Sequence, residues 1–334
     1  MTSARAREAW DTLRANFLRP GVDGSLDVWE GPTARRAPLW PVSQVLAAAV
    51  DVGALTGDHA YAEALVRGLA AFRRGEAYAP RPRQRRRYFD DNAWIGLELV
   101  RLHALSGDPT YLALARRVFA FVAGGQDPDG GVRWVEGRSS RNTCATAPAS
   151  ELALRLHLIE PDDALLGFAR RAMDWLERTL RLASGLLADR EDRGVIELTV
   201  WSYNQGAALG AFALLYAIEG RSTDRDAALT LARVSLEYLR GEVLWVHPPV
   251  FNAVWFRNLV DLEALAPVPG LADAFDGYLD RVWNQARDPR TGLFTRAGIG
   301  SYDGTPAIDH GGLTQLFALR AGWAGLPEVA GPFS

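Results

Sequence analysis

Two adjacent carboxylates, Asp90 and Asp91, lie between aromatic residues where an apolar, helix-periodic stretch begins; residues 88–94 read YFDDNAW. Cleavage of a glycosidic bond needs one carboxyl group that donates a proton, another that attacks or stabilises the reacting carbon, and aromatic faces on which sugars stack. Asp and Asn residues before an apolar run are also ordinary helix N-caps. The segment therefore has two interpretations, and taken alone it favours the cap.

The position of the pair at a helix start decides whether both carboxyl groups can face one cleft. Neighbours on a regular helix point about 100° apart, so we expect Asp90 to be extended and Asp91 to begin the helix. Adjacent positions favour the carboxyl separation of about 5–5.5 Å that retaining glycosidases use. Because two like charges so close cannot ionise equally, one pKa should rise and supply a general acid, while the helix N-terminus stabilises the other group as an anion. This argument leaves open which acid has which role.

The composition is that of an ordinary soluble globular protein, with 334 residues, of which 48% are hydrophobic and 23% are charged. A net charge of −3 argues against a dedicated nucleic-acid binder. The 11 tryptophans fit a large core and also suit carbohydrate platforms.

Cys144 is the only cysteine, which excludes an intrachain disulfide and a thiolate metal cluster, and the five histidines show no metal-ligand spacing. We therefore expect no metal and no cofactor. No apolar run approaches the roughly 20 residues of a membrane span, so we expect no membrane insertion, and we expect a monomer. The N-terminus lacks the apolar segment of a secretory signal. The chain as written would be cytoplasmic, whereas a chain whose export signal had been removed would read the same and be secreted.

The chain repeats a unit of two helices joined by a short turn, in which Gly ends one helix and Asp, with Pro just inside, starts the next. Helical periodicity predicts inner helices at 41–54, 91–105, 144–158, 203–218, 252–265 and 309–322, and outer helices at 59–74, 110–123, 163–181, 225–240 and 270–286. Residues 4–17 would be the sixth outer helix and close a ring, and residues 129–134 and 195–200 would form short strands. We predict one all-α (α/α)6 barrel over residues 1–334, because an open solenoid would need capping repeats.

The N-terminal ends of the inner helices would share one rim, and the loops there carry polar and aromatic residues at matching places in different repeats. These residues are Trp40, Asp90, Asp91, Asn142, Thr143, Cys144, Tyr203, Asn204, Gln205, Phe251, Asn252, Asp309 and His310. A purely structural barrel would not require this pattern. It predicts a shared cleft.

Several of these segments resemble those of one enzyme family. Residues 88–97, YFDDNAWIGL, closely resemble the catalytic segment of family 76 glycoside hydrolases, the endo-α-1,6-mannanases. Residues 130–134 (GGVRW), 142–149 (NTCATAPA) and 203–207 (YNQGA) resemble further segments of that family. Residues 251–259 (FNAVWFRNL) do so with Asn252 where a lysine often stands. The order and spacing hold from about residue 40 to about residue 320, and the ordered set is far more specific than any one motif.

The resemblance implies an (α/α)6 fold and a retaining double displacement, with Asp90 as nucleophile and Asp91 as acid/base. By position it also implies that Tyr203, Asn204 and Gln205 line the sugar subsites, with Trp134, Asn142 and Arg257 as further candidates. From their place on the rim we add Trp40, Asn92, Phe251, Asn252 and His310 as candidate substrate-binding residues; His310 could equally be a helix cap.

Other residues have a structural interpretation beside a functional one. Cys144 is more typical of a small buried residue than of a nucleophile, because no histidine pairs with it in a thiol-hydrolase pattern. The basic run Arg81, Arg83, Arg85, Arg86 and Arg87 favours a solvated loop, with contact to a phosphate- or uronate-bearing glycan as the alternative. Among the tryptophans, we expect Trp94, Trp175 and Trp283 in the core and Trp40, Trp134, Trp201 and Trp255 as stacking surfaces.

The sequence thus predicts a retaining glycoside hydrolase that cleaves α-1,6-linked mannan or mannooligosaccharides within the chain. An α-mannosyl transglycosylase or an exo-acting glycosidase on the same fold would use the same two acids. A non-catalytic glycan-binding protein would be expected to have lost one acid, and both are present. An epimerase would need histidine as acid/base on the inner helices, where only His103 and His157 lie away from the helix ends, and neither is at the rim.

Overall fold

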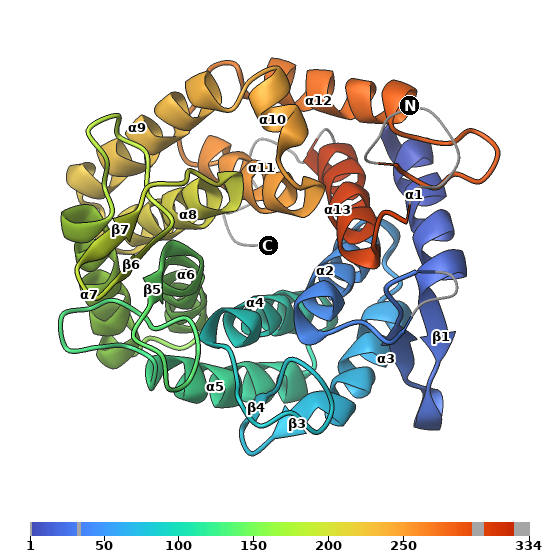
Figure 1. The fold of residues 1–334 in the computed structure, drawn as a ribbon, viewed down its shortest axis with the longest axis horizontal. Coiled ribbons are helices and arrows are strands. Elements are labelled where there is room, and N and C mark those ends of the chain that lie inside the picture. The colour runs from blue at the N-terminus through green and yellow to red at the C-terminus, as the bar shows by residue number, and fades with distance from the viewer. Residues whose placement is uncertain (1, 32–34, 296–303, 324–334) are drawn as a thin grey trace.

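Six helices of dense apolar sequence form a closed inner ring (Figure 1). The computed structural model describes residues 2–31, 35–295 and 304–323. Within them, the inner helices are α2 (Leu39–Thr56), α4 (Phe89–Ser106), α6 (Thr143–Ile159), α8 (Ser202–Glu219), α11 (Pro249–Glu263) and α13 (Ala307–Trp323). Each inner helix packs against the next, and α13 packs against α2, so the ring closes.

The outer helices are α1 (Thr2–Phe17), α3 (Ala60–Gly68), α5 (Pro109–Ala123), α7 (Asp163–Thr179), α9 (Ser222–Tyr238) and α12 (Leu271–Gln285). The N-terminal helix α1 lies against α13 at the other end of the chain and completes the outer layer (Figure 1). The predicted (α/α)6 barrel is therefore confirmed, and every inner helix begins and ends within three residues of its predicted bounds.

Two outer segments differ from the prediction. The helix predicted at 59–74 ends at Gly68, where the carbonyl oxygen of Leu26 occupies the space that a Cβ would need, and it continues as the 3₁₀ turn η2 (Leu69–Phe72). A short helix that the periodicity did not predict, α10 (Glu242–Val246), lies before α11.

The turns between helices follow the expected chemistry. Gly57 and Gly107 end α2 and α4 in the left-handed conformation, with φ of 74° and 71°, which glycine adopts without steric cost. Asp108 then caps α5, because its side chain accepts a hydrogen bond from the N–H of Thr110. Helix α2 is long and apolar enough to cross a membrane by length and composition, but 78% of it is buried in the barrel wall, as befits a core helix.

The connecting loops contain short antiparallel strands. They are β1 (Leu18–Pro20) with β2 (Leu26–Val28), β3 (Arg73–Arg74) with β4 (Ala77–Tyr78), and the three-stranded order β5 (Arg141–Asn142), β6 (Arg190–Asp192) and β7 (Val195–Glu197). The strand predicted at 195–200 is β7, whereas residues 129–134 form only isolated bridges. Because Asn142 pairs with Arg190, this sheet brings the loop before α6 beside the loop before α8.

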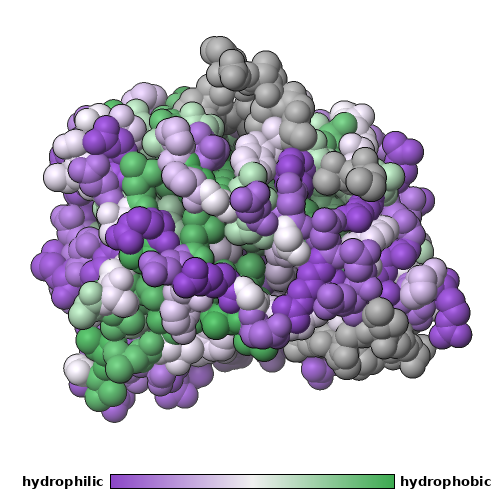
Figure 2. All heavy atoms as spheres, turned by 90° about the horizontal axis from the view of Figure 1, so that it is seen from above, coloured by the Kyte–Doolittle hydropathy of each residue, from purple (hydrophilic) through white to green (hydrophobic). Residues whose placement is uncertain are grey.

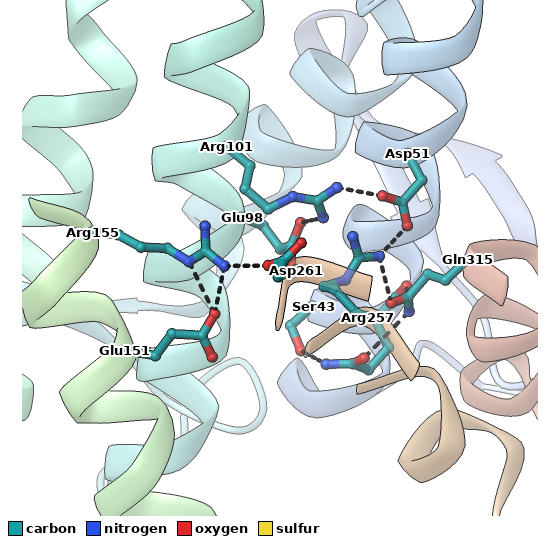
Figure 3. A network of polar contacts seen from close by, with 10 residues as sticks. Ser43, Asp51, Glu98, Arg101, Glu151, Arg155, Arg257, Asp261 and Gln315 are labelled. Atoms are coloured by element: carbon teal, nitrogen blue, oxygen red, sulfur yellow. Dashed lines mark hydrogen bonds and ion pairs between the residues drawn. The ribbon is translucent and has the colours of Figure 1, made fainter. Parts of the chain in front are cut away.

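A network of charged side chains joins the inner helices across the interior of the ring (Figure 3). Asp51 of α2 accepts hydrogen bonds from both Arg101 of α4 and Arg257 of α11, and Arg257 also contacts Gln315 of α13. A second cluster joins Arg155 of α6 to Glu151 at 2.9 Å and to Asp261 of α11 at 2.8 Å. Since α2 and α11, like α6 and α11, are not neighbours in the ring, these ion pairs span the lumen.

Burial alone would raise the pKa of Asp51, but the two guanidinium groups of Arg101 and Arg257 outweigh it, and the pKa of this carboxyl lies below its usual value. Arg101 lies about 15 Å along α4 from Asp91, at 1.5 Å rise per residue. The ion pair between Arg101 and Asp51 therefore lies toward the end of the barrel opposite the rim on which the inner helices begin.

Candidate active site

Asp90 and Asp91 both lie in the first turn of α4, which begins at Phe89. The expectation that Asp90 would be extended is wrong: the extended residue is Tyr88, with φ −100° and ψ 136°. The reason lies in the loop that contains Trp134, because the N–H of Phe89 donates to the carbonyl of Trp134 and Tyr88 bridges to Val135. These contacts fix the start of α4 one residue before the acids.

A pocket of about 480 Å³ contains both carboxyl groups at this rim. Its wall is made by Trp40, Pro80, Gln84, Tyr88, Asp90, Asp91, Trp94, Trp134, Asn142, Cys144, Asp189, Arg190, Tyr203 and Phe251. Ring pairs form much of this wall: Trp40 with Trp94 at 5.6 Å between centroids, Tyr88 with Trp134 at 5.1 Å, and Tyr203 stacked on Phe251 at 3.9 Å. Aromatic faces around two acids are suited to holding a sugar.

A larger groove, of about 690 Å³, lies on the outside of the barrel between α5 and α7. Its carboxylates, Asp127 and Asp162, form a loop contact to Arg133 and a helix cap, respectively. We assign the site to the smaller pocket, because of these two cavities only the smaller one holds two adjacent acids.

The carboxylate of Asp90 is surrounded by hydrogen-bond donors. Its Oδ1 accepts the N–H of Asp91 at 2.9 Å, and its Oδ2 accepts the indole N–H of Trp134 at 2.8 Å, with the Sγ of Cys144 at 3.7 Å. Burial raises the pKa of Asp90 to about 7, and these donors hold it from rising further because they stabilise the anion.

Asp91 has the opposite surroundings. It is buried, and among the described residues no donor reaches its carboxyl group. Burial and the adjacent charge of Asp90 together raise the pKa of Asp91 well above its usual value. The two groups titrate as a pair, and the state favoured near neutral pH has the negative charge on Asp90 and the proton on Asp91.

Cys144 lies on the same wall, and burial together with the charge of Asp90 raises the pKa of its thiol well above the usual value. The thiol stays protonated and can donate to Asp90, in keeping with a buried residue that is not a nucleophile.

Of the candidate substrate-binding residues, Trp40, Trp134, Asn142, Tyr203 and Phe251 lie on the pocket wall with the two acids. A regular placement underlies this: Trp40, Asp90, Cys144 and Tyr203 are each the second residue of an inner helix. The second residue of α2, α4, α6 and α8 thus faces the pocket, whereas α11 contributes its third residue, Phe251.

Six other candidates lie in the protein interior instead, where they bind the polypeptide: Asn92, Asn204, Gln205, Asn252, Arg257 and His310. None of the six is on the pocket wall, and direct contact of these residues with a substrate stays a prediction. Asn92 binds the N–H and C=O of Tyr78 and the C=O of Tyr88, and Gln205 binds the N–H and C=O of Leu187.

The remaining four have similar structural contacts. Asn252 bonds Ser202 and the carbonyl of Leu244. Arg257 belongs to the interior network of Figure 3. His310 is buried between the rings of Phe17 and Phe294, whose centroids lie 4.6 and 5.6 Å from that of the imidazole. Asn204 donates to Asp189 at 3.1 Å, so it reaches the pocket only through that carboxylate.

The sequence argument missed Asp189, a further carboxyl group on the pocket wall whose pKa is raised by burial and lowered in part by Asn204. The available signal was its place just before Arg190 in a loop leading to an inner helix. Two tryptophans differ from the expectation. Trp94 lines the pocket, whereas Trp255 is fully buried and its indole N–H donates to the hydroxyl oxygen of Ser235. Trp175 is buried as expected.

The basic run is a loop tied down at its two ends. Arg87 pairs with Glu136 at 2.7 Å, and Arg81 donates to the carbonyl of Arg36. Arg83, Arg85 and Arg86 between them are exposed.

An (α/α)6 barrel whose rim pocket holds two coupled carboxyl groups between aromatic walls is the architecture of a glycoside hydrolase. The family model described as Glycosyl hydrolase family 76 matches residues 17–248, and the chain belongs to this family.

Known proteins agree with this assignment. A Schizosaccharomyces pombe protein assigned as a mannan endo-1,6-alpha-mannosidase is 28% identical over 185 residues, which cover 48% of this chain and 41% of that protein. The match thus spans about two-fifths of the length of that relative.

Solved structures show the same fold. A family 76 mannosidase from Bacteroides thetaiotaomicron has a TM-score of 0.85 at 22% identity, covering 96% of this chain and 98% of the other. The α-1,6-mannanase GH76A from Salegentibacter sp. has a TM-score of 0.79 at 20% identity, covering 96% and 99%. An inactive variant of that mannanase, in which two adjacent aspartates are replaced by asparagine, was solved in complex with α-1,6-mannotriose (TM-score 0.75, 20% identity, covering 96% and 99%).

Proposed function

We propose that this chain hydrolyses α-1,6-mannosidic linkages with retention of configuration and that it cuts within the polymer. The observation that carries the proposal is the unequal pair of adjacent acids in an aromatic-walled pocket. The family assignment supports a mannan-degrading glycosidase. The two adjacent aspartates replaced in the inactive Salegentibacter mannanase, and the mannotriose bound to it, support the linkage and the role of Asp90 and Asp91. The name of the yeast relative supports endo action.

In this mechanism Asp90 attacks the anomeric carbon while Asp91 protonates the departing glycosidic oxygen. Asp90 fits the first role because its donors favour the anion, and Asp91 fits the second because its surroundings retain the proton. Once the leaving sugar has departed, Asp91 is ionised and removes a proton from the water that hydrolyses the glycosyl-enzyme. These surroundings support a division of roles that adjacency alone left open.

The direct test replaces each acid by its amide and measures hydrolysis of linear α-1,6-mannan. Asp90→Asn and Asp91→Asn should each lower kcat by about 10²–10⁴-fold or more, the usual contribution of such groups. The chain offers a matched control in its other adjacent aspartates, Asp162 and Asp163, which begin the outer helix α7. Asp162→Asn/Asp163→Asn should keep nearly full activity. Near-normal turnover in either Asp90→Asn or Asp91→Asn would remove the assignment.

A substrate with an activated leaving group tells the two roles apart. An aryl mannoside whose phenol is strongly acidic needs no proton donor when the phenolate departs. With this substrate, Asp91→Asn should again form the glycosyl-enzyme, whereas Asp90→Asn should not. The first sugar released from mannan by the natural chain should be the α-anomer by NMR, and early products should be oligosaccharides of mixed length. Early release of the β-anomer would exclude retention, and release of mannose alone would exclude endo action.

A further inference from the structure

The hairpin of β6 and β7 carries aliphatic side chains into solvent beside the active-site pocket. Val195, Ile196 and Leu198 are 72%, 40% and 63% exposed, and we call these three residues the hairpin tip. The hairpin begins at Asp189 and Arg190, which line the pocket. Figure 2 shows hydrophobic residues gathered at the lower left, on the side of the barrel that holds β6 and β7 in Figure 1. Clustered exposed aliphatics usually mark an interaction surface.

Exposed arginines lie in two other loops of the same rim. Arg83, Arg85 and Arg86 precede α4, and Arg138 lies in the next loop; we call these four residues the basic rim. None of the four forms an ion pair within the part of the chain that the structure describes. This is a concentration of free positive charge on a chain whose net charge is −3.

Hydrogen bonds link the loops that carry the basic rim to the hairpin that carries the tip. The N–H of Glu136 donates to the carbonyl of Arg87, and Ser139 donates to Asp192 at the end of β6. Of the nearby acids, Glu136 pairs with Arg87, whereas Asp192 and Glu197 accept only from the hydroxyl groups of Ser139 and Thr199 and keep their charges. The exposed Arg190 and Arg193 of the same hairpin balance these two charges. The surface therefore combines free cations with an aliphatic protrusion.

We propose that this face docks on a membrane surface rich in anionic lipid, with the hairpin tip among the headgroups and the basic rim against the phosphates. Aliphatic insertion beside cationic groups is the chemistry of peripheral membrane binding. A sugar polymer would be met by aromatic platforms rather than by Val, Ile and Leu, and a second copy would bring one basic rim against another. The pocket then faces the bilayer, so its substrate is a glycan held at that surface; only this last step rests on the proposed function.

The test measures co-sedimentation of the full chain with vesicles of phosphatidylcholine alone and of phosphatidylcholine with phosphatidylglycerol. Binding should require the anionic lipid and weaken with added salt. Val195→Ser/Ile196→Ser/Leu198→Ser and Arg85→Glu/Arg86→Glu should each weaken it by about tenfold or more. The matched controls are Leu158→Ser/Ile159→Ser, each 37% exposed at the far end of α6, and Arg7→Glu/Arg233→Glu on outer helices; both should bind normally.

Activity on a soluble mannooligosaccharide separates this proposal from the proposed function. The hairpin-tip and Arg85/Arg86 variants should keep normal rates on that soluble substrate, but they should lose any faster cleavage of the same oligosaccharide carried on a lipid in anionic vesicles. Absence of binding to anionic vesicles, or equal binding by the hairpin-tip variant and its control, overturns the proposal. So does a dimer of the natural chain in light scattering that the hairpin-tip variant abolishes, since the tip would then join two copies.

Discussion

The different surroundings of Asp90 and Asp91 arise from hydrogen-bond donors, since both residues lie in the first turn of α4. Asp90 receives an indole N–H, a backbone N–H and a thiol, and each stabilises its charge. Asp91 gains no such donor from the described residues and lies beside a negative charge, so it keeps its proton. In the proposed mechanism, the short loop that brings Trp134 to Asp90 therefore determines which of the two acids is the nucleophile.

Trp134→Phe tests this directly, because it retains an aromatic face and removes the N–H. Asp90 must be ionised to attack, so kcat/KM falls as pH drops through its pKa, which lies at about 7. Loss of the donor raises that pKa further. The acidic limb of the pH profile should move upward by about one pH unit, equivalent to one hydrogen bond of about 1.4 kcal/mol.

The matched control is Trp175→Phe, which removes an indole N–H from Asp129 on the outside of the barrel. Its acidic limb should stay in place. A profile for Trp134→Phe that keeps its position and differs only in KM would mean that the indole serves stacking alone.

At the scale of elements, the inner helices use their first turn in a repeated way. In α4, α6 and α8 the second residue faces the pocket, whereas the fourth residue holds a loop: Asn92 holds Tyr78, Thr146 accepts from the N–H of Val132, and Gln205 holds Leu187. At about 100° per residue, the second and fourth positions point to nearly opposite sides of a helix.

This geometry explains which site residues the sequence could predict. Repeated polar residues correctly located the rim, and Asp90, Tyr203 and Trp40 were found there. The face that each residue occupies depends on how a helix is rotated in the ring, which a loose repeat does not specify. Asn92 and Gln205 therefore looked like substrate ligands, although they bind backbone groups of loops that carry pocket residues.

Close contact between α8 and α11 depends on Gly206. A Cβ at this position would lie 2.5 Å from the Cα of Trp255 and 2.8 Å from its backbone nitrogen, which cannot move aside like a flexible side chain. Gly206→Ala should lower the free energy of unfolding by about 1–3 kcal/mol, as overpacking does. Gly277→Ala on the exposed face of α12, where a Cβ meets nothing within 4 Å, should raise it by about 0.5–1 kcal/mol. Urea unfolding measures both, and equal effects would show that the two helices can separate freely.

For the whole molecule, the ring was predictable because the turn residues between paired helices and the apolar period of each helix are local properties of the sequence. The amphipathic residues 4–17 even indicated the helix that closes it, α1. The interior ion network was not predictable in the same way. Asp51 and Arg257 stand 206 positions apart, and each looks like an ordinary polar residue until the closed ring brings their helices to face each other across the lumen.

The network gives the whole barrel a pH-dependent contribution to stability, which Asp51→Asn should remove. The change leaves Arg101 and Arg257 facing each other without their shared carboxylate, so at pH 7 it should cost about 3–5 kcal/mol, as breaking a buried ion pair does. The pKa of Asp51 is lowered in the folded state. Its contribution is therefore present above the unfolded pKa of about 3.9 and is lost as pH falls through the folded value.

Urea unfolding of the natural chain and of Asp51→Asn at pH 7 and below pH 4 measures this, and the difference between them should shrink as the pH falls. Arg225→Met, which breaks an exposed pair with Asp226, is the control and should change stability by at most about 1 kcal/mol. Arg257→Met should destabilise the barrel yet keep kcat and KM on mannooligosaccharides, because Arg257 holds Asp51 rather than a sugar. If fully folded Arg257→Met had a raised KM, Arg257 would be a substrate-binding residue after all. If the loss of unfolding free energy in Asp51→Asn persisted at low pH, packing rather than charge would hold the helices together there.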